Sequence, residues 1–218
     1  MLTTMRVSLL ALFGFFTLFS TLPAYGQLQA PHNQRVQVRI ASGPSLPYGT
    51  SDFSDQYQLG YSITSGLDIT LTPDWRLSLG GTYSYFNLHQ DAYRSLIRGS
   101  NSSEFEGHLA AYSGAMSLKH LILTEGRWIP YFAAGLGVYY RDEADVQVII
   151  NDRSYISDFR SNSTLAGGHV SGGIVYRIVE AISLYMEPRY TATASLSNTA
   201  NDTLDYLELR MGLILAPW

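Results

Sequence analysis

Residues 56–86 read QYQLGYSITSGLDITLTPDWRLSLGGTYSYF, and this stretch decides the fold. From residue 57 to residue 71, apolar side chains recur at every second position, with polar or small side chains between them. The breaker TPD (72–74) follows, and the alternation resumes from residue 75 to residue 85. A period of two is typical of a β-strand with one apolar and one polar face. The stretch therefore predicts a long hairpin with a tight turn.

The composition narrows the class of protein. Only 15% of the residues are charged, against roughly 25% in typical soluble domains, and Lys119 is the single lysine. The 16 tyrosines suit positions that need an apolar ring beside water. A net charge of −4 gives no basic patch for nucleic acid. Because cysteine is absent, disulfides and thiolate metal sites are excluded.

Residues 1–26 have the pattern of a cleaved signal peptide. Arg6 supplies a positive start, residues 7–22 an apolar run, and AYG (24–26) a small-residue cleavage site. A retained membrane helix is the alternative. No later run approaches the ~20 apolar residues of a spanning helix. The mature domain is therefore expected at residues 27–218, exported without a helical anchor.

Alternating segments repeat along the mature chain and give eight strands in all. Their connections alternate between long loops, at 43–55, 87–103, 141–163 and 195–203, and short turns, at 72–74, 124–127 and 180–181. We expect a bulge in the blurred alternation of 110–116. Within the loop 141–163, residues 146–155 alternate again around an Asn-Asp turn signal, which predicts a hairpin beyond any membrane. This arrangement indicates an all-β, eight-stranded, antiparallel up-and-down barrel.

Charge distribution indicates a transmembrane rather than a soluble barrel. A soluble, lipocalin-like barrel places apolar residues inside and charge outside. Here the charges lie on one strand face, and an arginine facing lipid near the midplane would cost ~2–4 kcal/mol. We therefore predict an inward charge network and an aliphatic outer face. The network comprises Arg39, Asp68, Arg76, Glu106, Glu187, Arg189, Glu208 and Arg210.

Outward-facing aromatic residues gather near the strand ends and predict the two aromatic girdles of a membrane barrel. The girdle residues are Tyr57, Tyr61, Trp75, Tyr83, Tyr85, Phe132, Tyr140, Tyr176, Tyr190 and Trp218.

With its exported precursor, eight strands, the motifs YFAAGLGVYY (131–140) and LYMEPRY (184–190) and a terminal aromatic, the chain resembles the OmpA-like transmembrane domain and the wider family of small outer-membrane β-barrels. The resemblance covers essentially all of the mature chain. It implies a bacterial outer membrane with lipid and lipopolysaccharide around the barrel, and insertion by the outer-membrane assembly machinery. It implies fold and location but hardly an activity.

The inward charges have two interpretations. Glu187 and Arg189 on one strand face Glu208 and Arg210 on the next, so cross-strand pairs are expected, with Asp68 and Arg76 paired across the first hairpin. An eight-stranded barrel is just wide enough for its own side chains, which favours a salt-bridged plug. A gate or selectivity constriction is the alternative. Small inward residues (Gly135, Gly137, Ser171 and Gly173) either accept long side chains from the opposite wall or leave a narrow path.

A catalytic alternative rests on His169 and Ser171, which resemble the His-x-Ser arrangement of an outer-membrane lipid A deacylase, with Glu180 or Glu187 as third member. Gly172 departs from that family's asparagine, and both residues face the lumen. The acidic loop 141–163 does not match a calcium-binding loop. We therefore expect no enzyme, metal or cofactor.

These observations predict a monomeric outer-membrane protein with a structural or surface-interaction role, whose extracellular partner binds at residues 141–163. A narrow passive channel for small or amphipathic solutes is the alternative, and a lipid A-modifying hydrolase is third.

Overall fold

The computed structural model describes residues 36–49, 52–89, 103–143, 146–150, 153–157, 162–196 and 203–216. The predicted signal peptide and Trp218 lie outside these ranges. No helix among the described residues is long and apolar enough to cross a membrane. The elements in chain order are β1 (Val36–Pro47), α2 (Asp52–Gln56), β2 (Gly60–Thr70), β3 (Trp75–Asn87), β4 (Ser103–Glu106), β5 (His108–Leu121), β6 (Trp128–Glu143), β7 (Val146–Ile150), β8 (Arg153–Ser157), β9 (Asn162–Val179), β10 (Ile182–Ser195) and β11 (Tyr206–Leu215).

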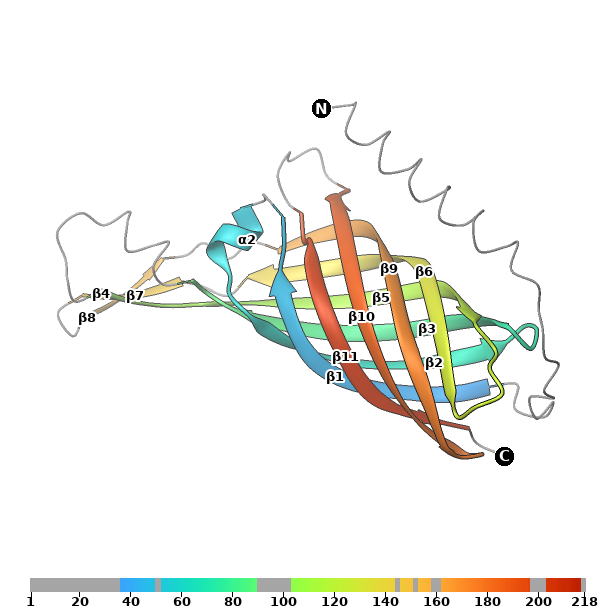
Figure 1. The fold of residues 1–218 in the computed structure, drawn as a ribbon. Coiled ribbons are helices and arrows are strands. Elements are labelled where there is room, and N and C mark those ends of the chain that lie inside the picture. The colour runs from blue at the N-terminus through green and yellow to red at the C-terminus, as the bar shows by residue number, and fades with distance from the viewer. Residues whose placement is uncertain are drawn as a thin grey trace.

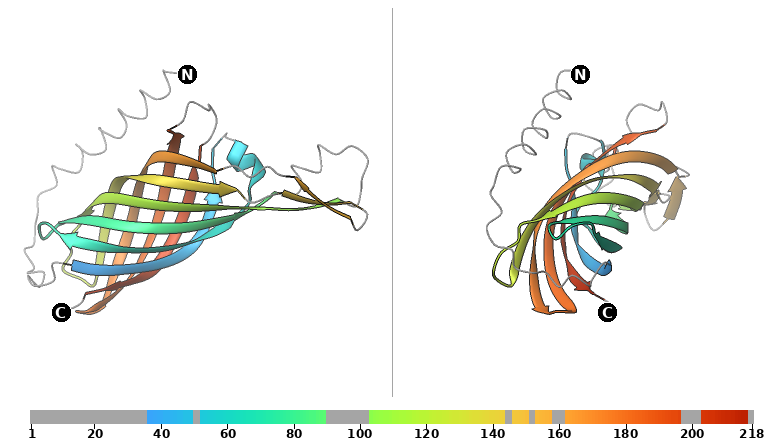
Figure 2. Two further views of the ribbon diagram at one scale, coloured as in Figure 1. Left: turned by 180° about the vertical axis from the view of Figure 1, so that it is seen from behind. Right: turned by 90° about the vertical axis from the view of Figure 1, so that its right-hand side faces the viewer.

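Eight of the strands close into a barrel in the order β1-β11-β10-β9-β6-β5-β3-β2 (Figures 1 and 2). Every neighbouring pair is antiparallel, and β1 closes the barrel on β11. The barrel strands contain 10 to 18 residues, which is enough to cross a bilayer at the tilt of a membrane barrel. The predicted eight-stranded up-and-down barrel is confirmed.

The first hairpin has the register that its alternation predicts. Tyr61 lies opposite Tyr85, and the pairing runs without interruption to Thr70 opposite Arg76. The turn is held by Thr72, whose hydroxyl donates to Asp74 Oδ1 at 2.6 Å and accepts from the Trp75 amide at 3.1 Å. The short turns lie at one end of the barrel, together with the start of β1 and the end of β11 (Figure 1). We call this the short-turn end.

The predicted bulge at 110–116 is wrong. Strand β5 pairs continuously with β3 on one side and with β6 on the other through this segment. Its blurred alternation has another cause: Leu109 and Ala111 are apolar but face the lumen, where they are 0% and 3% exposed. The register shifts instead at Ile182 and Ser183, where β10 leaves the tight turn from β9.

A second, three-stranded sheet has the order β4-β7-β8 and lies beyond the barrel at the opposite end, which we call the long-loop end (Figure 1). The hairpin predicted at 146–155 is confirmed as β7 and β8, which pair from Val146 opposite Ser157 to Ile150 opposite Arg153. Strand β4, which precedes β5, adds to the other side of β7. Helix α2 lies in the loop between β1 and β2, at the same end of the barrel.

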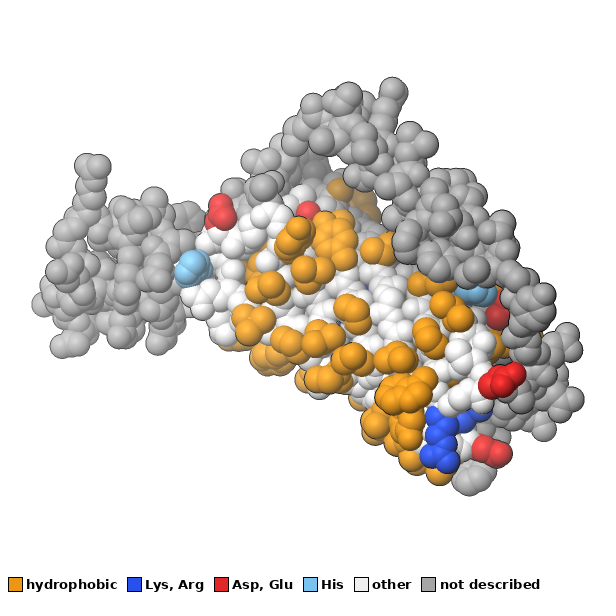
Figure 3. Space-filling view, in the orientation of Figure 1, with side chains coloured by type: hydrophobic (Ala, Val, Ile, Leu, Met, Phe, Trp, Pro, Cys, Tyr) orange, Lys and Arg blue, Asp and Glu red, His pale blue; other side chains and the backbone are white. Residues whose placement is uncertain are grey.

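The two faces of the barrel wall differ in chemistry. Hydrophobic side chains cover the outer wall, and charged side chains in Figure 3 lie toward the ends of the barrel. Exposed outer residues include Ile40, Ile63, Met116 and Leu136, which are 51 to 72% exposed. The inner face carries almost all of the buried charge on the described strands. An apolar outside around a charged inside is the pattern of a membrane barrel and the reverse of a soluble one.

Candidate functional site

Asp68 on β2 is the centre of the first charge cluster in the lumen. Its side chain is fully buried, and three other strands supply its partners. Lys119 Nζ from β5 lies 2.8 Å from Oδ2, and Arg39 Nη1 from β1 lies 3.4 Å from Oδ1. The Ser78 hydroxyl from β3 donates to Oδ1 at 2.7 Å. One carboxylate therefore compensates two buried cations.

Arg210 on β11 is the centre of the second cluster. Its Nη2 lies 2.6 Å from Glu208 Oε2 and donates to Thr82 Oγ1 at 3.1 Å, across the lumen. Its Nη1 lies 3.7 Å from Glu187 Oε1. The other oxygen of Glu187 accepts a hydrogen bond of 2.8 Å from the Tyr131 hydroxyl. Side chains from β3, β6, β10 and β11 therefore meet in one network.

Two aromatic rings connect the clusters. The Lys119 ammonium lies 4.7 Å from the centroid of the Tyr131 ring, whose hydroxyl binds Glu187. The Arg39 guanidinium lies 5.8 Å from the centroid of the Tyr185 ring. Contacts of this kind stabilise a desolvated cation by roughly 1–2 kcal/mol. The charged residues therefore form a continuous band across the lumen.

Apolar clusters fill the lumen on both sides of the Arg210 cluster. At the short-turn end the cluster consists of Ala41, Leu121, Ile129, Tyr131, Val175, Tyr185 and Ile214. At the long-loop end it consists of Phe53, Tyr57, Phe86, Leu88, Leu109, Ala111, Tyr139, Leu165, Leu204 and Tyr206. Phe53 of α2 packs edge-on against Phe86 with ring centroids 5.1 Å apart, so the helix adds a side chain to this cluster.

Six of the predicted network residues are buried in the lumen: Arg39, Asp68, Glu187, Arg189, Glu208 and Arg210. The predicted cross-strand pairs are present in the register, with Glu187 opposite Arg210 and Arg189 opposite Glu208. Arg189 is 8% exposed and has no carboxylate within 4.0 Å among the described residues. It is the one member of the set whose cation is buried without a direct ion pair.

Two members of the predicted network differ from the prediction, Glu106 in its position and Arg76 in its partner. Glu106 is on β4, opposite Gln147 of the three-stranded sheet, because the chain leaves the barrel before Gly107. Arg76 does not pair with Asp68, since the register places it opposite Thr70. It donates instead to Gln37 Oε1 near the short-turn end. The assignment of Glu106 to the barrel lumen is therefore wrong. Arg76 faces inward as predicted, but its direct partner is Gln37 and not Asp68.

Sequence reasoning missed Lys119, which is 1% exposed and binds Asp68. Its position gave a usable signal, because Lys119 lies an even number of residues from Ser117 and Leu121 on the inner face of β5. The apolar Leu109 and Ala111 on that same face obscured the parity. The Tyr131 hydroxyl was also missed, because tyrosine was read only as an interfacial residue.

The outer wall carries aromatic residues at both ends. Toward the long-loop end, Tyr61, Tyr83, Tyr85, Tyr112 and Tyr140 form a series with neighbouring centroids 5.2 to 6.5 Å apart. Toward the short-turn end the aromatic contacts join Trp75, His120 and Phe132, and separately Trp128 and Tyr176. Tyr190 packs edge-on with Tyr48.

Tyr57 does not belong to either girdle. It is 6% exposed, packs in the apolar cluster of the mouth and donates its hydroxyl to Glu143 Oε1 at 3.0 Å. Helix α2 ends just before it and turns the chain inward, so its parity with the strand that follows does not apply. The assignment of Tyr57 to the girdle is therefore corrected.

The residues of the catalytic alternative face the lumen. His169 is 5% exposed, and its ring lies against the position where Gly135 leaves no side chain. Its Nδ1 has no hydrogen-bond partner among the residues that the structure describes. Ser171 lies opposite Arg189. The described part of the chain also holds no group of three or more side chains suited to a metal ion.

No protein-family model matches the chain, and no curated protein matches it. Among solved structures it is similar to Neisserial surface protein A, with 18% identity and a TM-score of 0.48 over 84% of this chain and 96% of that one. It is similar to the N-terminal β-barrel domain of OprF from Pseudomonas aeruginosa, with 16% identity and a TM-score of 0.41 over 84% and 97%. It is also similar to the outer-membrane protein AlkL, with 13% identity and a TM-score of 0.38 over 90% of this chain and 94% of that one. The likeness to these three solved structures is one of fold, at 13 to 18% identity.

Proposed function

We propose that the chain is an integral β-barrel of a bacterial outer membrane, exported by its first 26 residues, and that it acts as a monomer in interactions at the cell surface. The apolar outer wall between two aromatic series supports the location, since lipid accepts such a surface. Insertion in this orientation leaves the short turns in the periplasm and the three-stranded sheet outside the cell.

The observation that carries the proposal is the filled lumen. Ion pairs cross it, and apolar clusters pack on both sides of them. A passive channel needs a continuous path for water, and an enzyme acting on lipid needs its catalytic groups on the lipid face. The packed lumen argues against the first requirement, and the burial of His169 inside the barrel argues against the second. The external surface is therefore the proposed site of function.

The external sheet supports a role in binding another protein. Strand β8 pairs only with β7 among the described strands, so its other edge presents unpaired backbone groups. Such an edge can accept an extended strand from a partner by β-augmentation. Specific binding through backbone hydrogen bonds does not require the lumen to open.

A channel is the second candidate, and Arg189 is the observation that favours it. Its guanidinium is buried without a direct ion pair, which is costly unless water or an ion solvates it. A hydrated pocket beside Arg189 could form part of a narrow path.

Single-channel conductance of the refolded protein in a planar bilayer tests the closed lumen. We expect a silent wild type, discrete conducting steps for the Arg189→Ala, Arg210→Ala double variant, and a silent Arg127→Ala control, because Arg127 is an exposed turn residue. Conducting steps of the wild type, with ion selectivity altered in the double variant, would replace the proposal by the channel.

Deletion of residues 146–155 tests the surface role. This hairpin has its own backbone pairing outside the barrel, so the deletion should leave the barrel folded and silent in the bilayer. Adhesion of bacteria that express the variant to polystyrene should then fall to the level of bacteria without the protein. Unchanged adhesion, with wild-type adhesion above background, would exclude the hairpin as the binding element.

A further inference from the structure

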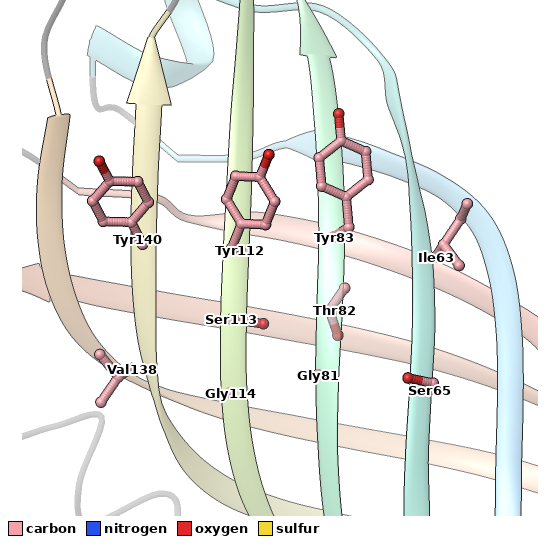
Figure 4. Close-up of a pocket in the computed structure, with 10 residues that line it drawn as sticks. All are labelled: Ile63, Ser65, Gly81, Thr82, Tyr83, Tyr112, Ser113, Gly114, Val138 and Tyr140. Atoms are coloured by element: carbon pink, nitrogen blue, oxygen red, sulfur yellow. The ribbon is translucent and has the colours of Figure 1, made fainter.

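A groove crosses the outer wall of the barrel over β2, β3, β5 and β6 (Figure 4). Its volume is about 560 Å³. Three small residues form its floor, because Ser65 lies directly opposite Gly81, and Gly81 directly opposite Gly114. Val138 of β6 continues the same row. The row spans three steps between strands, about 14 Å at the usual strand spacing.

The packing of the barrel does not require these glycines. A Cβ atom added to Gly114 would have no atom within 4 Å, and one added to Gly81 would lie at an ordinary 3.5 Å from the Ser113 carbonyl oxygen. Inward-facing Gly135 differs, because a Cβ there would lie 2.3 Å from the Met116 carbonyl oxygen. The outer glycines therefore leave open space that the fold does not use.

Bulky side chains form both walls of the groove. On the long-loop side, Tyr83, Tyr112 and Tyr140 lie in one row across the strands, and their hydroxyl groups point toward the long-loop end (Figure 4). On the other side, Met116 lies opposite Leu136, which is 72% exposed. On β5 the two wall residues, Tyr112 and Met116, are four residues apart, which is about 13 Å along the strand. Their side chains occupy part of this distance, so the groove is narrower than about 13 Å.

The chemistry of the lining selects the occupant. No acidic or basic side chain lines the groove, and the exposed apolar side chains of Met116 and Leu136 continue its surface on the outer wall. Among the described contacts, the hydroxyls of Tyr83, Tyr112 and Tyr140 make no hydrogen bond within the protein, so they are available as donors. A shallow apolar groove with hydroxyl donors at one edge matches a hydrocarbon chain that carries a polar head.

We propose that this groove binds one acyl chain of a bilayer lipid, with the lipid headgroup hydrogen-bonded to the three tyrosine hydroxyls. The inference rests on the proposed membrane location, because only there do lipids surround the wall. The chain lies across the floor of Ser65, Gly81 and Gly114, and the phosphate oxygens of the headgroup accept from the phenols. The site thereby retains a specific lipid against exchange with the surrounding bilayer.

Native mass spectrometry of the mature protein released from dimyristoylphosphatidylglycerol nanodiscs tests the site. We expect a major wild-type species that retains one lipid. Gly114→Leu fills the groove without a clash and should reduce the lipid-bound fraction at least tenfold. Gly172→Leu is the matched control, because Gly172 is an outward-facing glycine on β9 outside the groove and its Cβ would lie 3.8 Å from the nearest atom. It should retain the lipid.

Replacing the three tyrosines by phenylalanine tests the headgroup contact. This variant keeps the apolar wall and should lose most of the bound lipid at the collision energies that the wild type withstands. Equal lipid retention by Gly114→Leu and Gly172→Leu would overturn the inference, as would a wild type without bound lipid. A wild-type dimer that Gly114→Leu converts to a monomer would assign the groove to a second copy instead. Failure of all variants to enter nanodiscs would refute the membrane location.

Discussion

Replacing Asp68 by asparagine should be among the most damaging single changes in the barrel. Asp68 is 0% exposed and is the only carboxylate that the structure places within 4.0 Å of Lys119 or Arg39 among the described residues. The amide of Asp68→Asn would keep an acceptor for the Ser78 hydroxyl but would leave two buried cations without a direct ion pair. Removing one partner of a buried ion pair costs about 3–5 kcal/mol. That loss is a large part of the roughly 5–15 kcal/mol that holds a typical domain together.

Removing the cation of Lys119 should cost less than removing the charge of Asp68. Lys119→Met removes one cation and keeps all but one atom of the length of the side chain, while Asp68 retains Arg39 at 3.4 Å and Ser78 at 2.7 Å. We expect a loss of about 1–3 kcal/mol. In the double variant Asp68→Asn, Lys119→Met, the uncompensated lysine is absent. Its loss of stability should therefore be smaller than the sum of the two single losses by at least about 1 kcal/mol.

Urea unfolding of the refolded protein in lipid vesicles, followed by tryptophan fluorescence, measures these differences. Glu180→Gln is the control, because Glu180 is an exposed carboxylate in the turn after β9. It should change the free energy of unfolding by less than about 0.5 kcal/mol. Additivity of the two lumen substitutions within about 0.5 kcal/mol would refute the coupling, and an Asp68→Asn loss as small as the control's would refute the buried network.

Three further predictions concern single side chains. Lys119 is 1% exposed, so amine-reactive reagents should leave it unmodified in the folded protein and label it after thermal unfolding. Peptide mass mapping measures the labelling, and equal labelling in both states would contradict the burial of Lys119. Gly135→Ala should cost about 1–3 kcal/mol in urea unfolding by overpacking, whereas Gly114→Ala should stay within about 0.5 kcal/mol, and equal effects would contradict the difference in space around the two glycines. Burial raises the pKa of Asp205, a loop residue, so its ionisation opposes folding, and stability should fall as the pH rises through its ordinary pKa to its raised one. Asp205→Asn, which keeps an acceptor for the Thr193 amide, should remove that part of the pH dependence of the urea midpoint.

Strand existence, strand order and the two faces of the wall followed from period-two alternation, because a barrel between lipid and a polar lumen imposes that alternation on every strand. The rule fails at the mouth of the barrel. There α2 and Leu109 line an apolar interior, so apolar residues no longer indicate the outer face. The inward position of Tyr57 and the blurred parity of β5 have this single cause.

The partners within the lumen were less accessible to sequence reasoning than the residues themselves. Glu187 and Arg210 were paired correctly because they lie on adjacent strands in matching register. Asp68 and Lys119 lie on strands separated by β3, and their contact depends on the width and tilt of the closed barrel. Alternation along a strand carries no information about distances across a lumen.

The inner and outer glycines together indicate where a ligand can bind. A Cβ atom at Gly135 would lie 2.6 Å from the His169 ring, one at Gly173 2.6 Å from the Tyr131 hydroxyl oxygen, and one at Gly167 3.0 Å from the Tyr139 ring. Each of these lumen glycines thus accepts a large neighbour, which supports jigsaw packing over a narrow path. Gly114 accepts none. The side chains of the described lumen use the space beside these inner glycines, whereas the space beside Gly114 on the outer wall stays open and forms part of the proposed groove.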